Sequence, residues 1–459
     1  MPGRQISPTS LRLIVAIMLS ALILCWPAYL NGFPLVFGDT GNYIGQAILH
    51  YIGWNAPPFY SIFLLATDWR LTLWPPILVQ GLMAASLVSI VLHQFGLRGP
   101  WPTLSACIGL SIFTSLPWVA SELMADVYTG IVVLSLTMLA FGTLALWQRL
   151  YLLLLAFFAI AVHQSHIPLA FGLLLVGCAV RWWQDGRGAA LLAFRRLAPA
   201  PVLATILVFS VNLLGLGQAA VSPYGSIVLA ARMIGDGTAI SYLHAACPTE
   251  HYKICDHLDQ VGKGGSSMLW SKPDLWIEMG GTRAWAPESA RIVRGTIAYS
   301  PYAFVVAALD NGMQQFAAMQ TGERLEAWAK PDGPRPLIAR FFPGELYAFD
   351  HSRQETGHLV QDVKPFAALH VAIAWLGLAG LLVAIITERR NNPAFGLCLM
   401  VLAAVIGNAM ITGALSGVES RYAARIAWLL GFTPCLILAA HLRVRTVLAS
   451  AARSGVFSR

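Results

Sequence analysis

The sequence predicts an all-α polytopic membrane protein with about ten transmembrane helices. Hydrophobic residues make up 57% of the 459 residues, charged residues make up only 11%, and apolar runs near twenty residues long separate the few charged clusters. Soluble domains carry about 25% charged residues, whereas about twenty apolar residues cross the ~30 Å hydrocarbon core of a bilayer as a helix. The composition therefore argues against a soluble domain.

Most apolar runs are long enough to be read as spans. The first run, 11–30, follows a basic start, but Trp26 and Pro27 stand where a signal peptide would have small residues, so we predict that it stays uncleaved. The apolar segment after Pro57-Pro58 is too short to span and predicts an interfacial helix in the first outer loop. The predicted spans are 11–30, 75–95, 101–119, 127–147, 150–164, 167–182, 199–217, 365–387, 393–415 and 423–442.

The arginines predict the orientation of these spans. If the N-terminus is cytoplasmic, the clusters at 187–196, 389–390 and 443–445 fall on one side, and the short opposite loops keep chiefly Arg70 and Arg421. By the positive-inside rule this predicts a bacterial-type inner (plasma) membrane protein with both termini cytoplasmic. The formal net charge of +8 does not indicate a nucleic-acid partner, because the arginines form no continuous stripe.

The pattern divides the chain into an N-terminal transmembrane region, an extracytoplasmic loop domain and a C-terminal transmembrane region. Their bounds are 1–217 (with a polar first outer loop at 31–74), 218–364 and 365–459. The middle region mixes Gly, Pro, Trp and charged residues, which predicts a small soluble segment on the outer face. Its Cys247 and Cys255 are predicted to form a disulfide in an oxidising compartment. Unpaired thiols or half of a metal site are the alternatives.

Three acidic residues stand at the outer ends of predicted spans. Asp39 follows the first span among glycines and aromatic residues, where a carboxylate can have a raised pKa and accept a proton. Its alternative is a turn aspartate that bonds its own backbone. Glu122 and Asp126 are spaced to share one helix face and predict an acidic pocket together with Asp39. The alternative role of Glu122 and Asp126 is to place negative charge at the N-terminus of the next span, where it complements the helix dipole.

Several other polar residues face the same predicted side of the membrane. His163 and His166 are three residues apart and predict binding of a sugar hydroxyl or phosphate, or structural histidines bonded to backbone. Arg421 opposes the positive-inside trend, so we expect an anionic partner: a phosphate, or Glu419 or Glu122 as an ion-pair partner.

The middle region offers further candidates for binding a substrate. Arg232 follows an apolar run, and Arg340 stands in a basic-aromatic turn. Three tryptophans could stack on sugar faces or anchor the segment at the lipid interface. They are Trp270, Trp276 and Trp285.

The order of these features resembles that of GT-C-type glycosyltransferases, which take sugars from polyprenyl-phosphate carriers on the outer face of the membrane. The resemblance covers the whole chain: one span, a long outer loop with the early acid Asp39, an interfacial helix, a second acidic element and a later outer segment. The pair Arg421-Tyr422 before the last span is similar to what several lipid-linked sugar transferases show. In many members the first-loop acid has an acidic partner. Here Thr40 occupies that position, a departure that bears on metal binding and base strength.

The resemblance implies an enzyme that transfers a sugar from a polyprenyl-phosphate-linked donor to a glycan, lipid or protein acceptor. Asp39, assisted by Glu122, would deprotonate the acceptor hydroxyl, and Arg421 with Arg232 would meet the charge of the leaving phosphate. Membrane lipids are implied partners, a divalent cation stays open as a cofactor, and no metal-ligand set is identified. A transporter or flippase of a lipid-linked or small polar substrate is the alternative, although such proteins usually place polar residues mid-span and often show repeated halves. An outer-face acyl- or phosphotransferase is the third reading.

Overall fold

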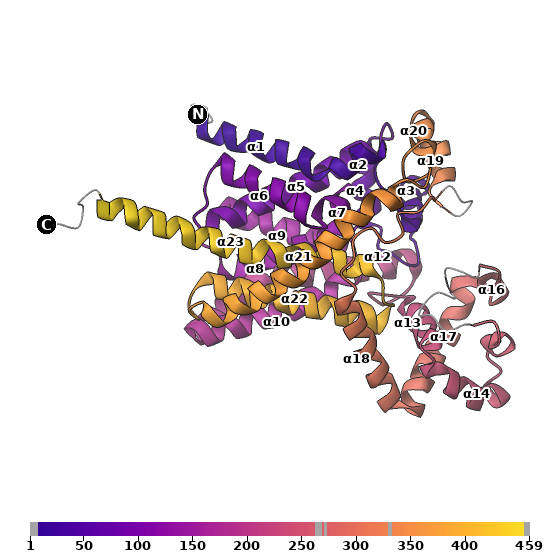
Figure 1. Cartoon of the computed structure of the whole chain (residues 1–459). Helices are drawn as coiled ribbons and strands as arrows, with labels where there is room; N and C mark the ends of the chain where they lie inside the picture. The colour runs from indigo at the N-terminus through magenta and orange to yellow at the C-terminus, as the bar shows by residue number, and fades with distance from the viewer. Residues whose placement is uncertain (1–7, 262–268, 270–272, 329–332, 454–459) are drawn as a thin grey trace.

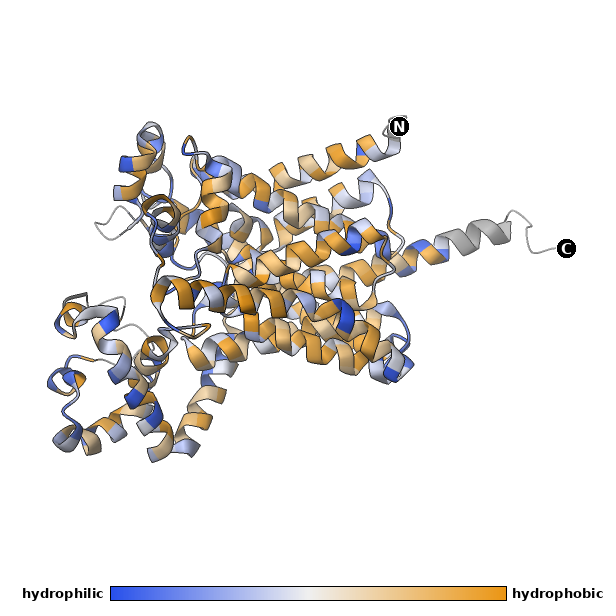
Figure 2. Cartoon of the chain, turned by 180° about the vertical axis from the view of Figure 1, so that it is seen from behind, coloured by the Kyte–Doolittle hydropathy of each residue, from blue (hydrophilic) through white to orange (hydrophobic). Residues whose placement is uncertain are grey.

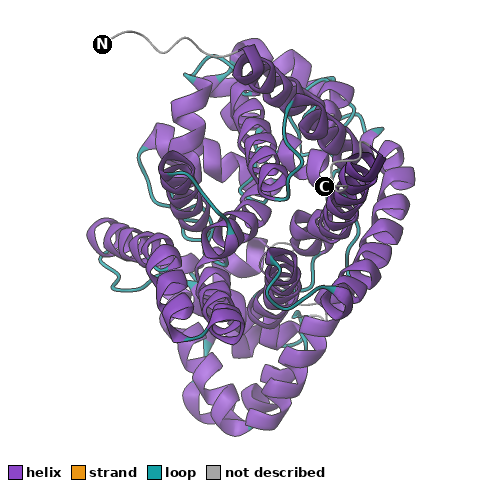
Figure 3. Ribbon diagram, turned by 90° about the vertical axis from the view of Figure 1, so that its left-hand side faces the viewer, coloured by secondary structure: helices purple, strands orange, loops and turns teal. Residues whose placement is uncertain are grey.

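The computed structural model describes residues 8–261, 269, 273–328 and 333–453. In these residues the secondary structure is helical, and the only extended pairing is an isolated bridge between Leu35 and Glu122. The long helices run side by side as a bundle (Figure 1), and many are seen nearly end-on in Figure 3. The predicted all-α class and the membrane-type character of the chain are confirmed.

Six helical segments are long and apolar enough to cross a membrane, so the expected ten spans are not confirmed. Other expected spans fall on shorter apolar helices, among them Val127–Phe141 and Leu146–Ala161. The expected span 11–30 is divided at Cys25, because Pro27 lies in the first turn of the next helix and cannot donate a backbone hydrogen bond. The six segments are Trp74–Gln94, His166–Asp185, Arg187–Leu216, Leu359–Thr387, Pro393–Leu415 and Ser420–Thr446.

The N-terminal region forms most of the bundle. Residues 31–74, the predicted first outer loop, contain two short helices, α3 and α4, and α4 corresponds to the predicted interfacial helix. The helices are α1 (Pro8–Leu24), α2 (Trp26–Asn31), α3 (Gly38–Leu49), α4 (Phe59–Asp68), α5 (Trp74–Gln94), α6 (Pro100–Phe113), α7 (Leu116–Ser121), α8 (Val127–Phe141), α9 (Leu146–Ala161), α10 (His166–Asp185), α11 (Arg187–Leu197) and α12 (Pro199–Leu216).

The helices of the middle region lie at the opposite end of the bundle from the start of α1 and the end of α23 (Figure 1). Figure 2 shows a bundle coloured mostly orange, with blue residues concentrated at its ends and in this region. The middle region contains α13 (Gly225–Gly235), α14 (Thr238–Glu250), η1 (Lys253–His257), α16 (Pro273–Glu278), α17 (Gly281–Tyr299), α18 (Pro301–Ala317), α19 (Arg335–Phe341), η2 (Pro343–Glu345) and α20 (Leu346–Asp350). The C-terminal helices are α21 (Leu359–Thr387), α22 (Pro393–Leu415) and α23 (Ser420–Arg453).

Glycines let α23 pack closely against its neighbours. A Cβ atom added at Gly130 of α8 would clash with the indole ring of Trp428, and one at Gly377 of α21 would clash with the backbone of Leu430. Small residues at such crossings allow helix backbones to approach in membrane proteins, where van der Waals packing drives association. This packing sets the position of the first turn of α23 relative to the start of α8.

The middle-region helices α13, α14, α16 and α17 share a hydrophobic core of their own, with Trp285 fully buried in it. The predicted disulfide between Cys247 and Cys255 is confirmed, with 5.7 Å between the two Cα atoms. The carboxylate of the buried Glu288 accepts the backbone N–H groups of Lys253 (3.0 Å) and Ile254 (3.3 Å). The disulfide and this carboxylate together hold the Cys loop against α17.

Removal of the disulfide should loosen this core of the middle region. Closing so short a loop is worth about 2–3 kcal/mol in the chain-entropy model. A double Cys247→Ser/Cys255→Ser variant should therefore be cleaved by protease within 218–261 at a lower denaturant concentration than the wild type. Cys178→Ser, which removes an unpaired cysteine of α10, is the control. Finding both Cys247 and Cys255 freely alkylated in non-reduced protein would contradict the pairing.

Candidate functional site

The predicted first outer loop, residues 31–74, is bonded directly to the segment between α7 and α8. Leu35 N–H donates to the carbonyl of Ser121, and Leu123 N–H donates to the carbonyl of Leu35, both at 2.9 Å. The Thr40 hydroxyl donates to the Leu123 carbonyl (3.2 Å) and accepts the Phe37 N–H (2.9 Å), at the start of α3. These bonds place the first turn of α3 beside residues 122–126. Thr40, which stands where a second acid was expected, therefore joins two backbone segments.

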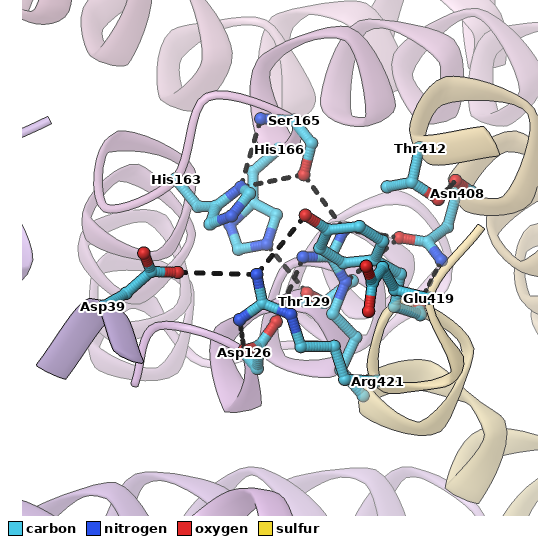
Figure 4. A network of polar contacts seen from close by, with 12 residues as sticks. Asp39, Asp126, Thr129, His163, Ser165, His166, Asn408, Thr412, Glu419 and Arg421 are labelled. Atoms are coloured by element: carbon cyan, nitrogen blue, oxygen red, sulfur yellow. Dashed lines mark hydrogen bonds and ion pairs between the residues drawn. The ribbon is translucent and has the colours of Figure 1, made fainter. Parts of the chain in front are cut away.

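Two arginines in the first turns of α23 lie beside Asp39 and Asp126, and Figure 4 shows the contacts of Arg421 with both acids. Arg421 and Arg425 are four residues apart and so share one face of the helix. Arg421 Nη2 lies 3.5 Å from Asp39 Oδ2, and its Nη1 lies 3.5 Å from Asp126 Oδ2. Arg425 Nη1 lies 3.2 Å from Asp126 Oδ1. The structure thus joins residues from α3, α8 and α23 in one polar cluster.

The Arg421 guanidinium is held between aromatic rings and keeps donor capacity. Its Cζ lies 4.1 Å from the ring centroid of Phe37 and 4.8 Å from that of Tyr422. Its Nη2 donates to the Tyr422 hydroxyl at 3.3 Å, whereas its buried Nε has no hydrogen-bond partner in the described part of the chain. The side chain is 15% exposed. Long contacts and an unused N–H make this guanidinium a candidate anion-binding group.

Arg425, by contrast, is fully buried and bonded within the protein. Its Nη2 donates to Asn408 Oδ1 (2.8 Å) and to Ser165 Oγ (3.0 Å), in addition to the contact with Asp126. A buried charge is tolerated when it is paired and hydrogen-bonded in this way. Arg425 therefore positions Asp126 and joins α22, α23 and the start of α10. Asp126 itself is held by two arginines and is buried, which gives it the role of a structural anion.

The two histidines have different surroundings. His166 is buried, with Nδ1 2.6 Å from the carbonyl of Ala159 and Nε2 2.8 Å from Thr129 Oγ1. Because a carbonyl only accepts, Nδ1 carries the proton and Nε2 accepts from Thr129. Both ring nitrogens are hydrogen-bonded, so His166 is a structural histidine, which was one of its two predicted roles. It cannot bind a substrate without losing one of these bonds.

His163 keeps one ring nitrogen for other partners. Its Nδ1 accepts the backbone N–H of Ser165 at 3.2 Å, so the proton of the neutral ring lies on Nε2. Burial, together with the charges of Arg425 and Arg421, holds the pKa of His163 well below its ordinary value. His163 is therefore neutral at pH 7 and can donate one hydrogen bond through Nε2.

Asp39 and Glu122 differ in how they are paired. Asp39 Oδ1 accepts from Asn55 Nδ2 at 3.2 Å, and its other oxygen faces Arg421. Burial raises the pKa of Asp39, and Arg421 opposes that rise. The half-buried Glu122 carboxylate has no hydrogen bond or ion pair within the described ranges. Burial, then the charge of Asp126, raises the pKa of Glu122 to about 8. Glu122 is therefore mostly protonated at pH 7, and Asp39 is the better proton acceptor.

The shifted pKa of Glu122 predicts a pH dependence of stability. Unfolded Glu122 ionises near its ordinary pKa of 4.5, whereas the folded chain keeps the proton up to about pH 8. The folded state binds the extra proton in this window, so this group lowers the free energy of unfolding as pH rises from 4.5 to 8. Glu122→Gln removes the titration, and its unfolding temperature relative to the wild type should rise between pH 5 and pH 8.5. An unchanged difference at both pH values would contradict the shift.

Several predicted binding residues lie outside this cluster. Arg232 of α13 is buried and ion-paired with Asp236, the residue after this helix, and its guanidinium lies 5.5 Å from the Phe304 ring centroid. Arg340 lies over the ring of its neighbour Phe341 at the end of α19. In the described part of the molecule neither arginine contacts Asp39 or Arg421, so the structure does not place them with the proposed leaving group.

The tryptophans of the middle region contribute mainly to packing. The rings of Trp276 and Trp285 meet edge to face at 5.8 Å, and Trp285 has no exposed surface with which to contact a sugar. Trp270 lies outside the described residues.

Sequence reasoning missed several residues that shape the cluster. Asn408 interrupts an otherwise apolar helix, a signal that could have identified it. Phe37 and Ser165 carry no comparable signal. Glu419, one of the ion-pair partners predicted for Arg421, instead forms an ion pair with Arg324 at 2.8 Å. The backbone N–H of Arg421 donates to Glu323 Oε2 at 2.8 Å.

Within the residues that the structure describes, no group of three or more His, Cys, Asp or Glu side chains is placed to hold a metal ion. The acidic residues of the cluster face arginines instead. Comparison with protein-family models, curated proteins and solved structures found no match for this chain.

Proposed function

We propose that the chain is a membrane glycosyltransferase that moves a sugar from a polyprenyl-phosphate carrier to an acceptor hydroxyl at the outer face. The observation that carries the proposal is the pairing of Asp39 with Arg421 at the end of the bundle where α8, α10 and α23 begin. A proton acceptor and a phosphate-binding cation side by side are the two groups that such a transfer requires.

Asp39 suits the role of general base. Its carboxylate is 25% exposed, so a hydroxyl can reach it, and Asn55 fixes one of its oxygens. The raised pKa of Asp39 brings it closer to the operating pH, which makes proton transfer more efficient. Arg421 opposes this rise and so favours the ionised form of the carboxylate.

Arg421 suits the role of phosphate ligand. The rings of Phe37 and Tyr422, both in contact with the guanidinium, restrict its orientation, and its Nε–H has no partner in the described part of the chain. A guanidinium can donate two parallel hydrogen bonds to a phosphate. Binding of the donor would replace the long contact to Asp39 with shorter bonds to phosphate oxygens and release the carboxylate for the acceptor.

The proposed step is a single displacement. The acceptor oxygen forms a bond to the anomeric carbon while its proton passes to Asp39. The bond from the anomeric carbon to the phosphate oxygen breaks, and its electron pair leaves on the polyprenyl phosphate, where Arg421 meets the charge. Attack from the face opposite the phosphate inverts the anomeric configuration. Asp126 and Arg425 act as positioning residues, since they hold the first turn of α23 against α8.

Reconstituted protein incubated with labelled polyprenyl-phosphate sugars and a panel of acceptors tests this function. We expect equal amounts of free polyprenyl phosphate and labelled acceptor, with inverted anomeric configuration by NMR. Movement of intact donor between the leaflets, without cleavage of its sugar–phosphate bond, would instead identify a flippase and contradict the proposal.

A further inference from the structure

The middle region contains a helix, α18, with the apolar character of a membrane segment. The helices α17 and α18 meet at an angle of 106°, and together they satisfy the length and hydropathy expected of a membrane-spanning segment. Figure 1 shows α18 leaving the side of the bundle at the end that carries the middle region, and Figure 2 shows much of it coloured orange. This differs from the wholly soluble segment expected from the sequence.

One face of α18 presents large apolar side chains that are about half or more exposed in the part of the chain that the structure describes. They recur at intervals of three and four residues, which aligns them along one side of the helix. Each is between 46% and 81% exposed. A continuous stripe of this kind marks an interaction surface in folded proteins. The residues are Tyr302, Val305, Val306, Leu309 and Met313.

The other face of α18 packs on α22, which is itself a candidate membrane span. A Cβ atom at Gly312 would clash with Met410, and one at Gly413 would clash with the backbone of Asn311. Over the same stretch α22 exposes Ile406 and Leu415. The helix α18 therefore packs on a candidate membrane span that has exposed apolar side chains of its own.

We propose that α18 is embedded in the membrane leaflet at this end of the bundle, with its apolar stripe covered by lipid acyl chains. Asp310 and Gln314, which are hydrogen-bonded to each other at 2.7 Å, mark the polar border of the stripe. The occupant that fits this surface is bilayer lipid, because α18 together with α17 has the length and hydropathy of a membrane-spanning segment and packs on the candidate span α22.

The helix is also bonded to the candidate site. Gln315 Nε2 donates to the carbonyl of Glu419, and Glu419 N–H donates to Gln315 Oε1, both at 2.9 Å. These bonds attach α18 to the residue two positions before Arg421. A lipid-linked substrate that moves along α18 in the leaflet would arrive beside the proposed phosphate ligand. This last consequence rests on the proposed function, whereas the lipid contact does not.

Fluorescence quenching in reconstituted vesicles tests the lipid contact. An environment-sensitive probe is attached to Leu309→Cys or Met313→Cys in a Cys178→Ser/Cys435→Ser background that keeps the disulfide. The matched control is Ile277→Cys in α16, because the Ile277 side chain is 71% exposed and lies outside the apolar stripe of α18. We expect doxyl-labelled lipid to quench the two α18 probes at least threefold more than the Ile277 probe, and aqueous iodide to show the reverse order.

Two outcomes would overturn the proposal. Iodide quenching of the α18 probes equal to that at Ile277 would place the stripe in water. Protection from both quenchers would mean that protein, a second copy or another partner, covers it. Neither outcome bears on the transferase assay, because that assay depends on Asp39 and Arg421 and not on the surroundings of α18.

Discussion

Asp39→Asn should lower turnover by about 10²–10⁴-fold while leaving binding of the sugar donor nearly unchanged. The substitution keeps the size of the side chain and its hydrogen bond with Asn55. It replaces the carboxylate oxygen that faces Arg421 with an amide group, which cannot accept the proton. Loss of general-base assistance produces a fall of that order. Because the donor's phosphate is assigned to Arg421, the loss should appear in kcat, with the dissociation constant of the donor retained.

Two controls separate this effect from general damage. Asp185→Asn removes an acid from an ion pair at the far end of α10 and should leave turnover unchanged. Glu122→Gln should cost less than tenfold at pH 7, because the pKa of Glu122 is raised to about 8 and the residue is already protonated there. A larger loss for Glu122→Gln than for Asp39→Asn would assign the base to Glu122 and contradict the division of roles.

Arg421→Ala should raise the dissociation constant of the donor about ten- to hundredfold and slow turnover as well. Hydrogen bonds to charged groups are worth about 1.5–3 kcal/mol each, which corresponds to this range. Arg421→Lys should recover only part of the affinity, because a point charge cannot replace two parallel N–H donors or stack on Phe37. Titration of each variant with labelled polyprenyl-phosphate sugar measures the affinity directly.

The matched control for this arginine is Arg181→Ala, which breaks the Arg181–Asp185 ion pair at the C-terminal end of α10. It should leave donor affinity unchanged, and its unfolding temperature gives the baseline for losing an arginine. Wild-type affinity in Arg421→Ala, together with a normal unfolding temperature, would show that the phosphate binds elsewhere.

The fold could be predicted from the sequence to the extent that apolar runs determine it. Runs such as 393–415 become single helices, whereas 11–30 is divided because Pro27 begins a new one. The lateral helix α18 was missed because Asp310 and the glutamines after it lower the apolar character of its run. Its burial against α22 depends on glycines whose partners are distant in sequence.

The individual residues of the candidate site could be predicted from the sequence, but the contacts between them could not. Asp39, Asp126 and Arg421 each stand out as charges beside apolar runs, yet Asp39 and Arg421 are separated by 382 positions. Their meeting depends on the bridge at Leu35, which no sequence pattern indicates. The roles of His163 and His166 diverge for a similar reason, since a spacing of three residues does not reveal which ring nitrogens the backbone will occupy.

A structure of the Asp39→Asn variant with a bound polyprenyl-phosphate sugar would test the central claim most directly. We predict that phosphate oxygens lie within hydrogen-bonding distance of the Arg421 guanidinium, roughly 2.7–3.2 Å. The anomeric carbon should lie on the side of residue 39, with room for an acceptor hydroxyl between them. A phosphate bound away from the start of α23, with Arg421 still in contact with residues 39 and 126, would contradict the account.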